Sequence, residues 1–304
     1  MSDQVRIVEV GPRDGLQNEK TPVSVEGRIA LIEALVAAGL RTVEVGAFVS
    51  PKAIPQMVGS DEVLRGVGRH TDGEFHVLVP NEKGYETARA NGAKVIAVFG
   101  SASEGFSRAN INCSVAESIE RFKPVIARAR ADGIKVRGYV SCVLGCPYDG
   151  EIRPKAVVDV AKVLWDLGCY EVSLGDTIGV GTPKKARELL RAVAGSVPMA
   201  HLAMHFHDTY GQALANLYAG MEEGARVIDS AAGGLGGCPY APGATGNVAT
   251  EDVVYMLEGM GIATGVDMAK LLAATNAISK LIGRPPLSRV ATALNAKKKR
   301  ANGE

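Results

Sequence analysis

Two histidines separated by a single residue are the clearest chemical signal in this sequence. His205 and His207 lie in the stretch HFHD, and three of the five histidines fall within residues 201–207. On a β-strand, residues i and i+2 point to the same face, so both imidazoles would project together. A lone histidine in a strand is usually a satisfied core or surface residue, whereas a pair at a strand end indicates a metal site.

Two charged motifs that contain glycine on both sides supply further candidates. Arg13 and Asp14 lie in GPRDG directly after an apolar run, and Asp176 lies in GDTIG after another. Either motif could be a simple surface turn with a weak ion pair. At the exit of a buried strand, beside Asn18 and Glu19, the Arg13–Asp14 pair is instead a candidate for anion recognition and for metal or proton chemistry.

Glu44 is a carboxylate in an apolar setting. It alternates with Val43 and Val45, which places it on the inner face of a strand. A lone buried carboxylate is costly. The sequence therefore predicts that Glu44 pairs with Arg13 from the neighbouring strand and orients it.

A glycine-rich stretch follows the last predicted strand. Residues 231–247 contain six glycines together with Cys238 and Asn247. The stretch could be only a flexible surface loop, or it could be a lid over an active site. Chemistry more often than packing accounts for a retained cysteine, so Cys238 is a candidate catalytic thiol.

Together, these residues offer mixed nitrogen and oxygen ligands for a metal. The candidate set is a carboxylate from Asp14, imidazoles from His205 and His207, and an amide carbonyl from Asn247. The set contains no thiolate, so it does not match a closed structural zinc site. It suits Mg²⁺ or Mn²⁺ with open positions for a substrate, although catalytic zinc also fits the composition.

The elements that must position these residues alternate from end to end. The predicted strands lie at residues 5–10, 42–46, 75–79, 94–99, 135–141, 170–174, 200–206 and 226–230. The predicted helices lie at about 25–38, 61–69, 82–91, 114–132, 154–167, 183–195, 211–223 and 249–258. Ser114 with Glu117 forms a capping box, and Pro154 and Pro183 suit first-turn positions of helices.

Eight such units over residues 5–258, at about 32 residues each, predict an α/β fold of the (β/α)8 TIM-barrel type. A doubly wound open sheet is the competing fold, but no GxGxxG motif follows the first strand. We expect one catalytic domain over residues 1–304. Its barrel would span about 4–258, additional C-terminal helices about 259–293, and a polar tail 294–304.

The composition excludes several classes of protein. The 34 lysines and arginines against 33 aspartates and glutamates leave a net charge of +1, so nucleic acid and anionic membrane surfaces are not expected partners. No uncharged apolar run approaches the ~18 residues needed to span a bilayer. Five cysteines, in a chain whose first predicted strand begins almost at once, indicate free thiols, no signal peptide and a cytoplasmic location.

Six segments, which follow one another along almost the whole chain, resemble the hydroxymethylglutaryl-CoA lyase family. They are VGPRDGLQNE (10–19), VEVGAFVSPK (43–52), GSASEGFSRANINCS (100–114), SLGDTIGVGTP (173–183), HFHDTYGQALAN (205–216) and GGLGGCPYAPGATGNVATEDVVYML (233–257). The Arg-Asp pair and the HxH motif alone indicate only a wider superfamily of metal-dependent acyl-transfer and aldolase barrels. The GGCPYAPGATGN loop is much more specific to the lyase.

The resemblance implies an enzyme that cleaves 3-hydroxy-3-methylglutaryl-CoA, an acyl-CoA, into acetyl-CoA and acetoacetate. Such enzymes usually serve leucine breakdown and are usually dimers, so a homodimer is expected. Carried over by position, the divalent metal would be held by Asp14, His205, His207 and Asn247.

The resemblance also implies roles for further residues. Arg13 would contact the substrate near its thioester oxygen, and Asn110 lies where the family contacts the substrate. Cys238 would be the catalytic thiol on a mobile loop. Glu44 and Asp176 would hold the polar site together.

The implied reaction agrees with the chemistry of these residues. Breaking the C2–C3 bond requires loss of the C3-hydroxyl proton while negative charge develops on the departing acetyl-CoA fragment. A divalent ion lowers the pKa of the hydroxyl, and the permanent cation of Arg13 stabilises the enolate oxygen. The group that takes the hydroxyl proton stays open among Asp14, His205 and a metal-bound water.

Two other functions compete with this interpretation. A condensing enzyme of the same superfamily, such as an isopropylmalate or citramalate synthase, would share Arg13, Asp14 and the HxH motif. Such enzymes often carry a regulatory domain, whereas only residues 259–304 follow this predicted barrel. A catalytically silent, metal-dependent binding barrel has the same fold, but polar residues at four or more strand exits argue against it.

Overall fold

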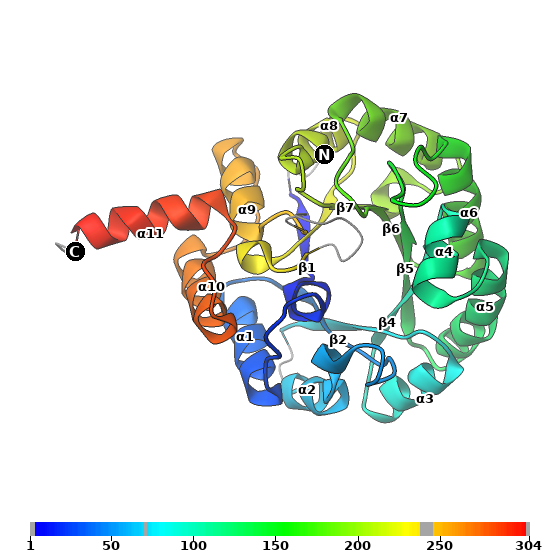
Figure 1. The fold of residues 1–304 in the computed structure, drawn as a ribbon, viewed down its shortest axis with the longest axis horizontal. Coiled ribbons are helices and arrows are strands. Elements are labelled where there is room, and N and C mark those ends of the chain that lie inside the picture. Colours follow the sequence, from blue (N-terminus) through cyan, green and yellow to red (C-terminus); the bar gives the residue numbers. More distant parts are fainter. Residues whose placement is uncertain (1–3, 70–71, 238–245, 302–304) are drawn as a thin grey trace.

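Eight parallel strands close into one barrel in the computed structural model of the protein (Figure 1). The structure describes residues 4–69, 72–237 and 246–301. The strands pair in sequence order, and the first also pairs with the last. Their bounds are β1 (Arg6–Glu9), β2 (Thr42–Ala47), β3 (Glu74–Leu78), β4 (Val95–Ser101), β5 (Lys135–Ser141), β6 (Glu171–Asp176), β7 (Leu202–Phe206) and β8 (Val227–Ser230). The predicted (β/α)8 barrel is confirmed.

Helices surround the strands and cover their outer faces (Figure 1). Those of the barrel are α1 (Val25–Ala37), α2 (Ser60–Val67), α3 (Glu82–Ala90), α4 (Glu104–Ile111), α5 (Val115–Ala131), α6 (Pro154–Leu167), α7 (Pro183–Ala194), α8 (Ala213–Glu222) and α9 (Thr250–Gly259). The predicted helices and strands agree with these bounds to within about two residues.

Local sequence signals set several of these boundaries. The Ser114 hydroxyl accepts from the Glu117 amide (3.1 Å) and the Glu117 carboxylate accepts from the Ser114 amide (2.8 Å), which completes the predicted capping box of α5. Pro154 and Pro183 lie in the first turns of α6 and α7. A missing N–H costs nothing there, because the first turn of a helix has no partner for it.

The structure adds α4, which the sequence analysis did not predict. The Ser103 side chain caps this helix by accepting from the Phe106 amide (3.0 Å). The buried residues of α4 are Phe106 and Ser107. So short and weak an apolar face gives no clear helical periodicity.

Two additional helices follow the barrel, as expected. α10 (Met268–Ile282) packs against α1, and the Thr21 hydroxyl donates to the Ile282 carbonyl (3.3 Å). α11 (Arg289–Ala301) extends away from the barrel (Figure 1). Residues 294–301, which were expected to be part of a polar tail, form the second half of α11 instead. The basic residues in the last turn of α11 stabilise the helix, because positive charges interact favourably with the C-terminal end of a helix dipole. Among the described helices, none combines the length and the apolar character that crossing a membrane requires.

The interior of the barrel contains charged as well as apolar side chains. The apolar residues of the strands, such as Val43 and Val172, are completely buried, as expected for a sheet covered on both faces. Charged side chains share this interior and are at most 2% exposed: Glu44, Arg137, Glu171 and Asp229. Such groups are stable only when paired, so the barrel must contain a network of ion pairs.

Gly39 is a position where the fold requires glycine. It follows α1 with a left-handed backbone (φ +102°), and a β-carbon there would lie 2.1 Å from the Gly265 carbonyl oxygen. Gly92 follows α3 with a similar φ of +88°, but a β-carbon there meets no atom of the described residues within 4 Å.

We predict that Gly39→Ala lowers the free energy of unfolding by about 1–3 kcal/mol more than Gly92→Ala. Both substitutions force alanine into a left-handed conformation, and only the first adds a steric clash. Urea unfolding of the two variants measures the difference. Equal losses would show that the backbone at Gly39 moves aside without cost.

Candidate active site

The predicted metal ligands lie together at the mouth of the barrel, where the carboxyl ends of the strands meet. Asp14 follows β1, while His205 lies in β7 and His207 directly after it. One potential ligand atom from each of these three residues lies within 4.8 Å of the others. Asn247 joins them, because its Nδ2 atom donates to Oδ2 of Asp14 (2.9 Å).

A π-helical turn over Gly11–Gly15 presents Arg13 and Asp14 side by side. The Val10 carbonyl accepts from the amides of Asp14 (2.8 Å) and Gly15 (3.2 Å). A β-carbon at Gly15 would lie 2.7 Å from the Leu235 side chain, so glycine permits the turn to pack against the segment after β8. The turn places Oδ2 of Asp14 3.9 Å from Nε2 of His205, and π-helical turns of this kind are frequent at functional sites.

Asn247 is held against the end of β7 by its backbone. It forms a bridge with His207, and the Asp208 amide donates to the Gly246 carbonyl (2.8 Å). The side-chain nitrogen of Asn247 faces Asp14 and the Leu235 carbonyl (3.3 Å). Asn247 would therefore bind a metal through its amide oxygen only after this amide turns over.

Two members of the cluster have protonation states that suit a cation. Burial would raise the pKa of Asp14, but the charges of Arg13 and the two histidines lower it to about 2. Burial and the charge of His205 lower the pKa of His207 to about 4. At neutral pH, Asp14 is therefore a carboxylate and His207 a neutral imidazole, the forms that bind metals.

His205 behaves differently because a second carboxylate contacts it. Burial would lower the pKa of His205, but the hydrogen bond to Asp229 and the charge of Asp14 raise it above its usual value of 6.5. Because these carboxylates favour a proton on His205, a cation competes with that proton, and cation binding should strengthen as the pH rises.

The residues present fit a divalent cation. Nδ1 of His207 is buried without a hydrogen-bond partner among the described residues, whereas buried polar atoms are nearly always paired. A carboxylate, two imidazoles and a nearby amide are ligand types that Mg²⁺, Mn²⁺ and related ions accept. The cluster of Asp14, His205 and His207 is a candidate divalent-metal centre.

Arg13 forms the ion pair with Glu44 that the alternation in β2 predicts. Its Nη2 lies 2.6 Å from Oε2 of Glu44, and its Nη1 lies 2.7 Å from Oδ1 of Asp14. Burial would lower the pKa of Arg13, but these two carboxylates raise it well above its usual value. Nε of Arg13 and Oε1 of Glu44 are buried without partners in the described part of the chain, which leaves hydrogen-bonding capacity for a ligand.

Asp176 lies at the end of β6 and secures the loop that follows. Its carboxylate accepts from the amides of Val180 (3.2 Å) and Gly181 (2.8 Å). Burial raises the pKa of Asp176 to about 6 in spite of these hydrogen bonds. The contacts fit the predicted role of holding the polar site together.

Two predicted site residues are not brought into this cluster by the described contacts. Asn110 lies on the exposed side of α4, and its contact with a substrate stays a prediction. Cys238 lies outside the described residues, so its predicted role also stays a prediction.

Sequence reasoning missed an ion pair behind His205. Nδ1 of His205 lies 3.2 Å from Oδ2 of Asp229, and Nη2 of Arg137 lies 2.7 Å from Oδ1 of Asp229. Burial would raise the pKa of Asp229, but the charge of Arg137 lowers it well below its usual value. The signal that identified Glu44 was present for both residues, since each is a charged residue within an otherwise apolar strand.

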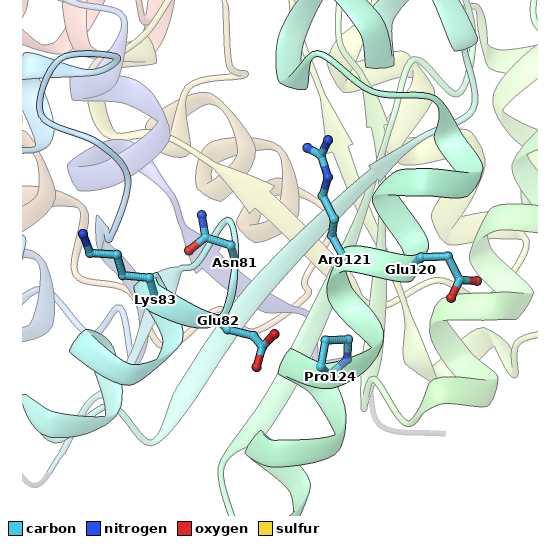
Figure 2. A pocket seen from close by; sticks show the side chains of 6 residues that line it. All are labelled: Asn81, Glu82, Lys83, Glu120, Arg121 and Pro124. Carbon is cyan, nitrogen blue, oxygen red and sulfur yellow. The ribbon is translucent and has the colours of Figure 1, made fainter.

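The surface also contains a hollow of about 500 Å³ between α3 and α5, shown in Figure 2. Its polar side chains serve local structure: Asn81 accepts from the Gly84 amide at the start of α3 (3.0 Å), and Arg121 donates to the Ile111 carbonyl (3.2 Å). None of its six lining residues is a predicted site residue. We therefore place the candidate active site at the mouth of the barrel and not in this hollow.

Fold and site together define a (β/α)8-barrel enzyme with a candidate divalent-metal centre at its mouth. The sequence model of the HMGL-like family matches residues 4–278. The chain therefore belongs to this family of hydroxymethylglutaryl-CoA lyases and related enzymes, as its motifs predicted, and it is a lyase of that family.

Known relatives match the chain over nearly its whole length. The 3-hydroxy-3-isohexenylglutaryl-CoA/hydroxymethylglutaryl-CoA lyase of Pseudomonas aeruginosa is 58% identical over 97% of this chain and 98% of its own. The human mitochondrial hydroxymethylglutaryl-CoA lyase is 55% identical over 95% of this chain and 89% of its own.

Solved structures show the same fold. The hydroxymethylglutaryl-CoA lyase of Pseudomonas aeruginosa superposes with a TM-score of 0.95 at 57% identity, covering 98% of this chain and 99% of that one. The lyase of Acinetobacter baumannii, in complex with coenzyme A and 3-methylmalate, has a TM-score of 0.92 at 37% identity and covers 96% of each chain.

We predict that His207→Ala weakens Mn²⁺ binding by more than about tenfold, because the cluster loses one of its nitrogen ligands. Isothermal titration of metal-free protein with Mn²⁺ measures the affinity. His201→Ala is the matched control, since His201 is an exposed histidine whose Nδ1 contacts the Tyr170 carbonyl (2.8 Å). Equal affinities of His207→Ala and the wild type would remove His207 from the metal site.

Proposed function

We propose that this lyase cleaves 3-hydroxy-3-methylglutaryl-CoA into acetyl-CoA and acetoacetate, with Mg²⁺ or Mn²⁺ held by Asp14, His205, His207 and Asn247. The observation that carries the proposal is the direct ion pair between Arg13 and Asp14 (2.7 Å). It places a permanent cation beside the candidate metal centre, so one site can stabilise both ends of the breaking bond.

The reaction redistributes one proton and two electron pairs. The C3 hydroxyl loses its proton, and the O–H electrons form the ketone of acetoacetate. The C2–C3 electrons leave with the acetyl-CoA fragment as its enolate, and a proton added at C2 gives acetyl-CoA. A divalent cation, when bound, lowers the pKa of the C3 hydroxyl and orients it.

The residues of the chain supply the remaining functions. Arg13 stays cationic and faces a developing negative charge with donor groups in a fixed plane, which suits an enolate oxygen. Its hold on Glu44 fixes the guanidinium before substrate binds, so little reorganisation is needed during the reaction. Asp14 and His205 stay open as acceptors of the hydroxyl proton, His205 only in a state in which its Nε2 does not bind the metal.

The proposed substrate is an acyl-CoA, which the Acinetobacter complex with coenzyme A and 3-methylmalate supports. We assign Asn110 on α4 to substrate contact and Cys238 to proton transfer at C2, as the family resemblance implies. The relative from Pseudomonas aeruginosa is named for a longer 3-alkyl substrate as well, so a longer substrate belongs in the assay.

We further propose a single-domain homodimer in the cytoplasm. The resemblance to a family of dimers supports the oligomeric state. The described cysteines Cys113, Cys142, Cys146 and Cys169 are free and buried, which supports a reducing compartment.

The test of the proposed function is a product assay with chelator-treated protein. The protein is given 3-hydroxy-3-methylglutaryl-CoA, or the 3-isohexenyl analogue, with Mg²⁺ or Mn²⁺, and acetoacetate or its longer homologue is measured. Metal-dependent formation of the 3-oxo acid supports the proposal. Rapid release of coenzyme A from pyruvate and acetyl-CoA, with no cleavage activity, would indicate the competing condensing enzyme.

We predict that Arg13→Lys loses most of its kcat although the charge is kept. Lysine is a point charge on a flexible stem, and it cannot bind Glu44, Asp14 and a substrate oxygen in one plane. The loss should fall on kcat more than on KM, because the interaction strengthens as the enolate forms. Steady-state kinetics of the variant measure both constants. A near-normal kcat would show that positive charge alone is sufficient.

We predict that Cys238→Ser lowers kcat by roughly 10²–10⁴-fold, the usual effect of losing a general acid–base group. Serine is nearly isosteric with cysteine, but its hydroxyl is far less acidic, so Mn²⁺ affinity should not change. Cys113→Ser is the control for a thiol outside the proposed site, and it should keep its kcat. Near-wild-type turnover of Cys238→Ser would leave Cys238 without a catalytic role.

A further inference from the structure

A buried ion pair on the inner side of His205 has no role in the functions described so far. Arg137 in β5 and Asp229 in β8 are 0% and 1% exposed. Well-packed apolar residues often stabilise a core as much as a buried ion pair does. The pair between Arg137 and Asp229 therefore calls for a reason other than stability.

The carboxylate of Asp229 is surrounded by donors. Nη1 of Arg137 donates to Oδ2 (3.0 Å) and Nη2 donates to Oδ1 (2.7 Å). The Ser173 hydroxyl donates to Oδ2 (2.8 Å). Asp229 is therefore fixed from two sides as a charged acceptor, and His205 lies directly opposite it in the register of β7 and β8.

This fixed acceptor determines which nitrogen of His205 carries the proton. Nδ1 of His205 lies 3.2 Å from Oδ2 of Asp229, and a carboxylate held by Arg137 can only accept a hydrogen bond. A neutral His205 must then carry its proton on Nδ1. Its lone pair lies on Nε2, the atom 3.9 Å from Oδ2 of Asp14.

The geometry points to Asp229 and Arg137 as positioning residues for the metal site: they hold His205 in the Nδ1–H tautomer, with its Nε2 lone pair turned toward Asp14. Neither residue touches the reacting groups. This inference rests on the proposed metal site, but it does not depend on which acyl-CoA is cleaved.

Arg137 also connects Asp229 and His205 to the ion pair of Arg13 and Glu44. Its Nη1 donates to the Tyr139 hydroxyl (2.6 Å), and that hydroxyl donates to Oε2 of Glu44 (3.3 Å). Oε2 of Glu44 is the atom that binds Arg13. The Tyr139 ring also lies edge-on to the His205 ring, with centroids 5.9 Å apart. One buried arginine thus supports both the histidine and the cation of the active site.

Asp229→Asn tests the role in metal binding. The asparagine amide is nearly isosteric, but it turns an N–H toward His205 or toward Arg137 and so disturbs the tautomer. We expect a 10- to 100-fold loss of Mn²⁺ affinity in the metal-free protein, the usual effect of removing a carboxylate that orients a ligating histidine.

Glu171→Gln is the matched control. Glu171 is as deeply buried and binds the same arginine, since its Oε1 accepts from Nε of Arg137 (2.7 Å). Both variants leave Arg137 with one neutralising carboxylate fewer, so both should lose stability. Only Asp229→Asn should lose Mn²⁺ affinity. Equal affinities of the two folded variants, whether reduced or not, would overturn the proposal.

A second measurement needs no variant of the ion pair and no activity. In metal-free wild-type protein labelled with ¹⁵N-histidine, at a pH where His205 is neutral, the ring nitrogen shifts report the tautomer, with His205→Asn assigning the signal. We expect the proton on Nδ1. A proton on Nε2 would overturn the proposal. The proposed lyase activity is tested separately, by the product assay.

Discussion

The four charges of Arg13, Glu44, Arg137 and Asp229 lie inside this barrel because each one is bound to an opposite charge. The ion pair of Arg13 with Glu44 (2.6 Å) and the ion pair of Arg137 with Asp229 (2.7 Å) are both buried between strands. An unpaired charge at such depth would cost several kcal/mol. Satisfying these charges therefore fixes where each side chain can lie, and this constraint positions the site at the mouth.

The two ion pairs have different roles in the proposed reaction. The pair of Arg13 and Glu44 presents a permanent cation for a developing enolate. The pair of Arg137 and Asp229 orients His205 toward Asp14. The Tyr139 hydroxyl joins the two ion pairs. Arg13, which faces the enolate, and His205, which faces the metal, are therefore held by one connected network of hydrogen bonds.

Most of the fold was predictable from the sequence because its elements follow strong periodic patterns. The eight strands, the capping box at Ser114 and the site residues at strand exits follow from local signals. The link between Arg13 and Glu44 was also predictable, since a carboxylate between two valines needs a cation. The GGCPYAPGATGN loop separated this family from other metal-dependent barrels by resemblance, not by physics.

Other features were not predictable because they depend on contacts between distant segments. The π-helical turn at Gly11–Gly15 exists where the chain after β8 packs on it through Leu235. The orientation of the Asn247 amide depends on Asp14, which lies 233 positions earlier in the chain. Strand patterns show that Arg137 and Asp229 are unusual, but only the closed barrel shows that they meet at His205.

The most direct test of the proposed metal site is anomalous diffraction from crystals of the protein grown with Mn²⁺. We predict one strong peak between Asp14, His205 and His207; a peak elsewhere, or none at a Mn²⁺ concentration that supports full activity, would contradict this assignment.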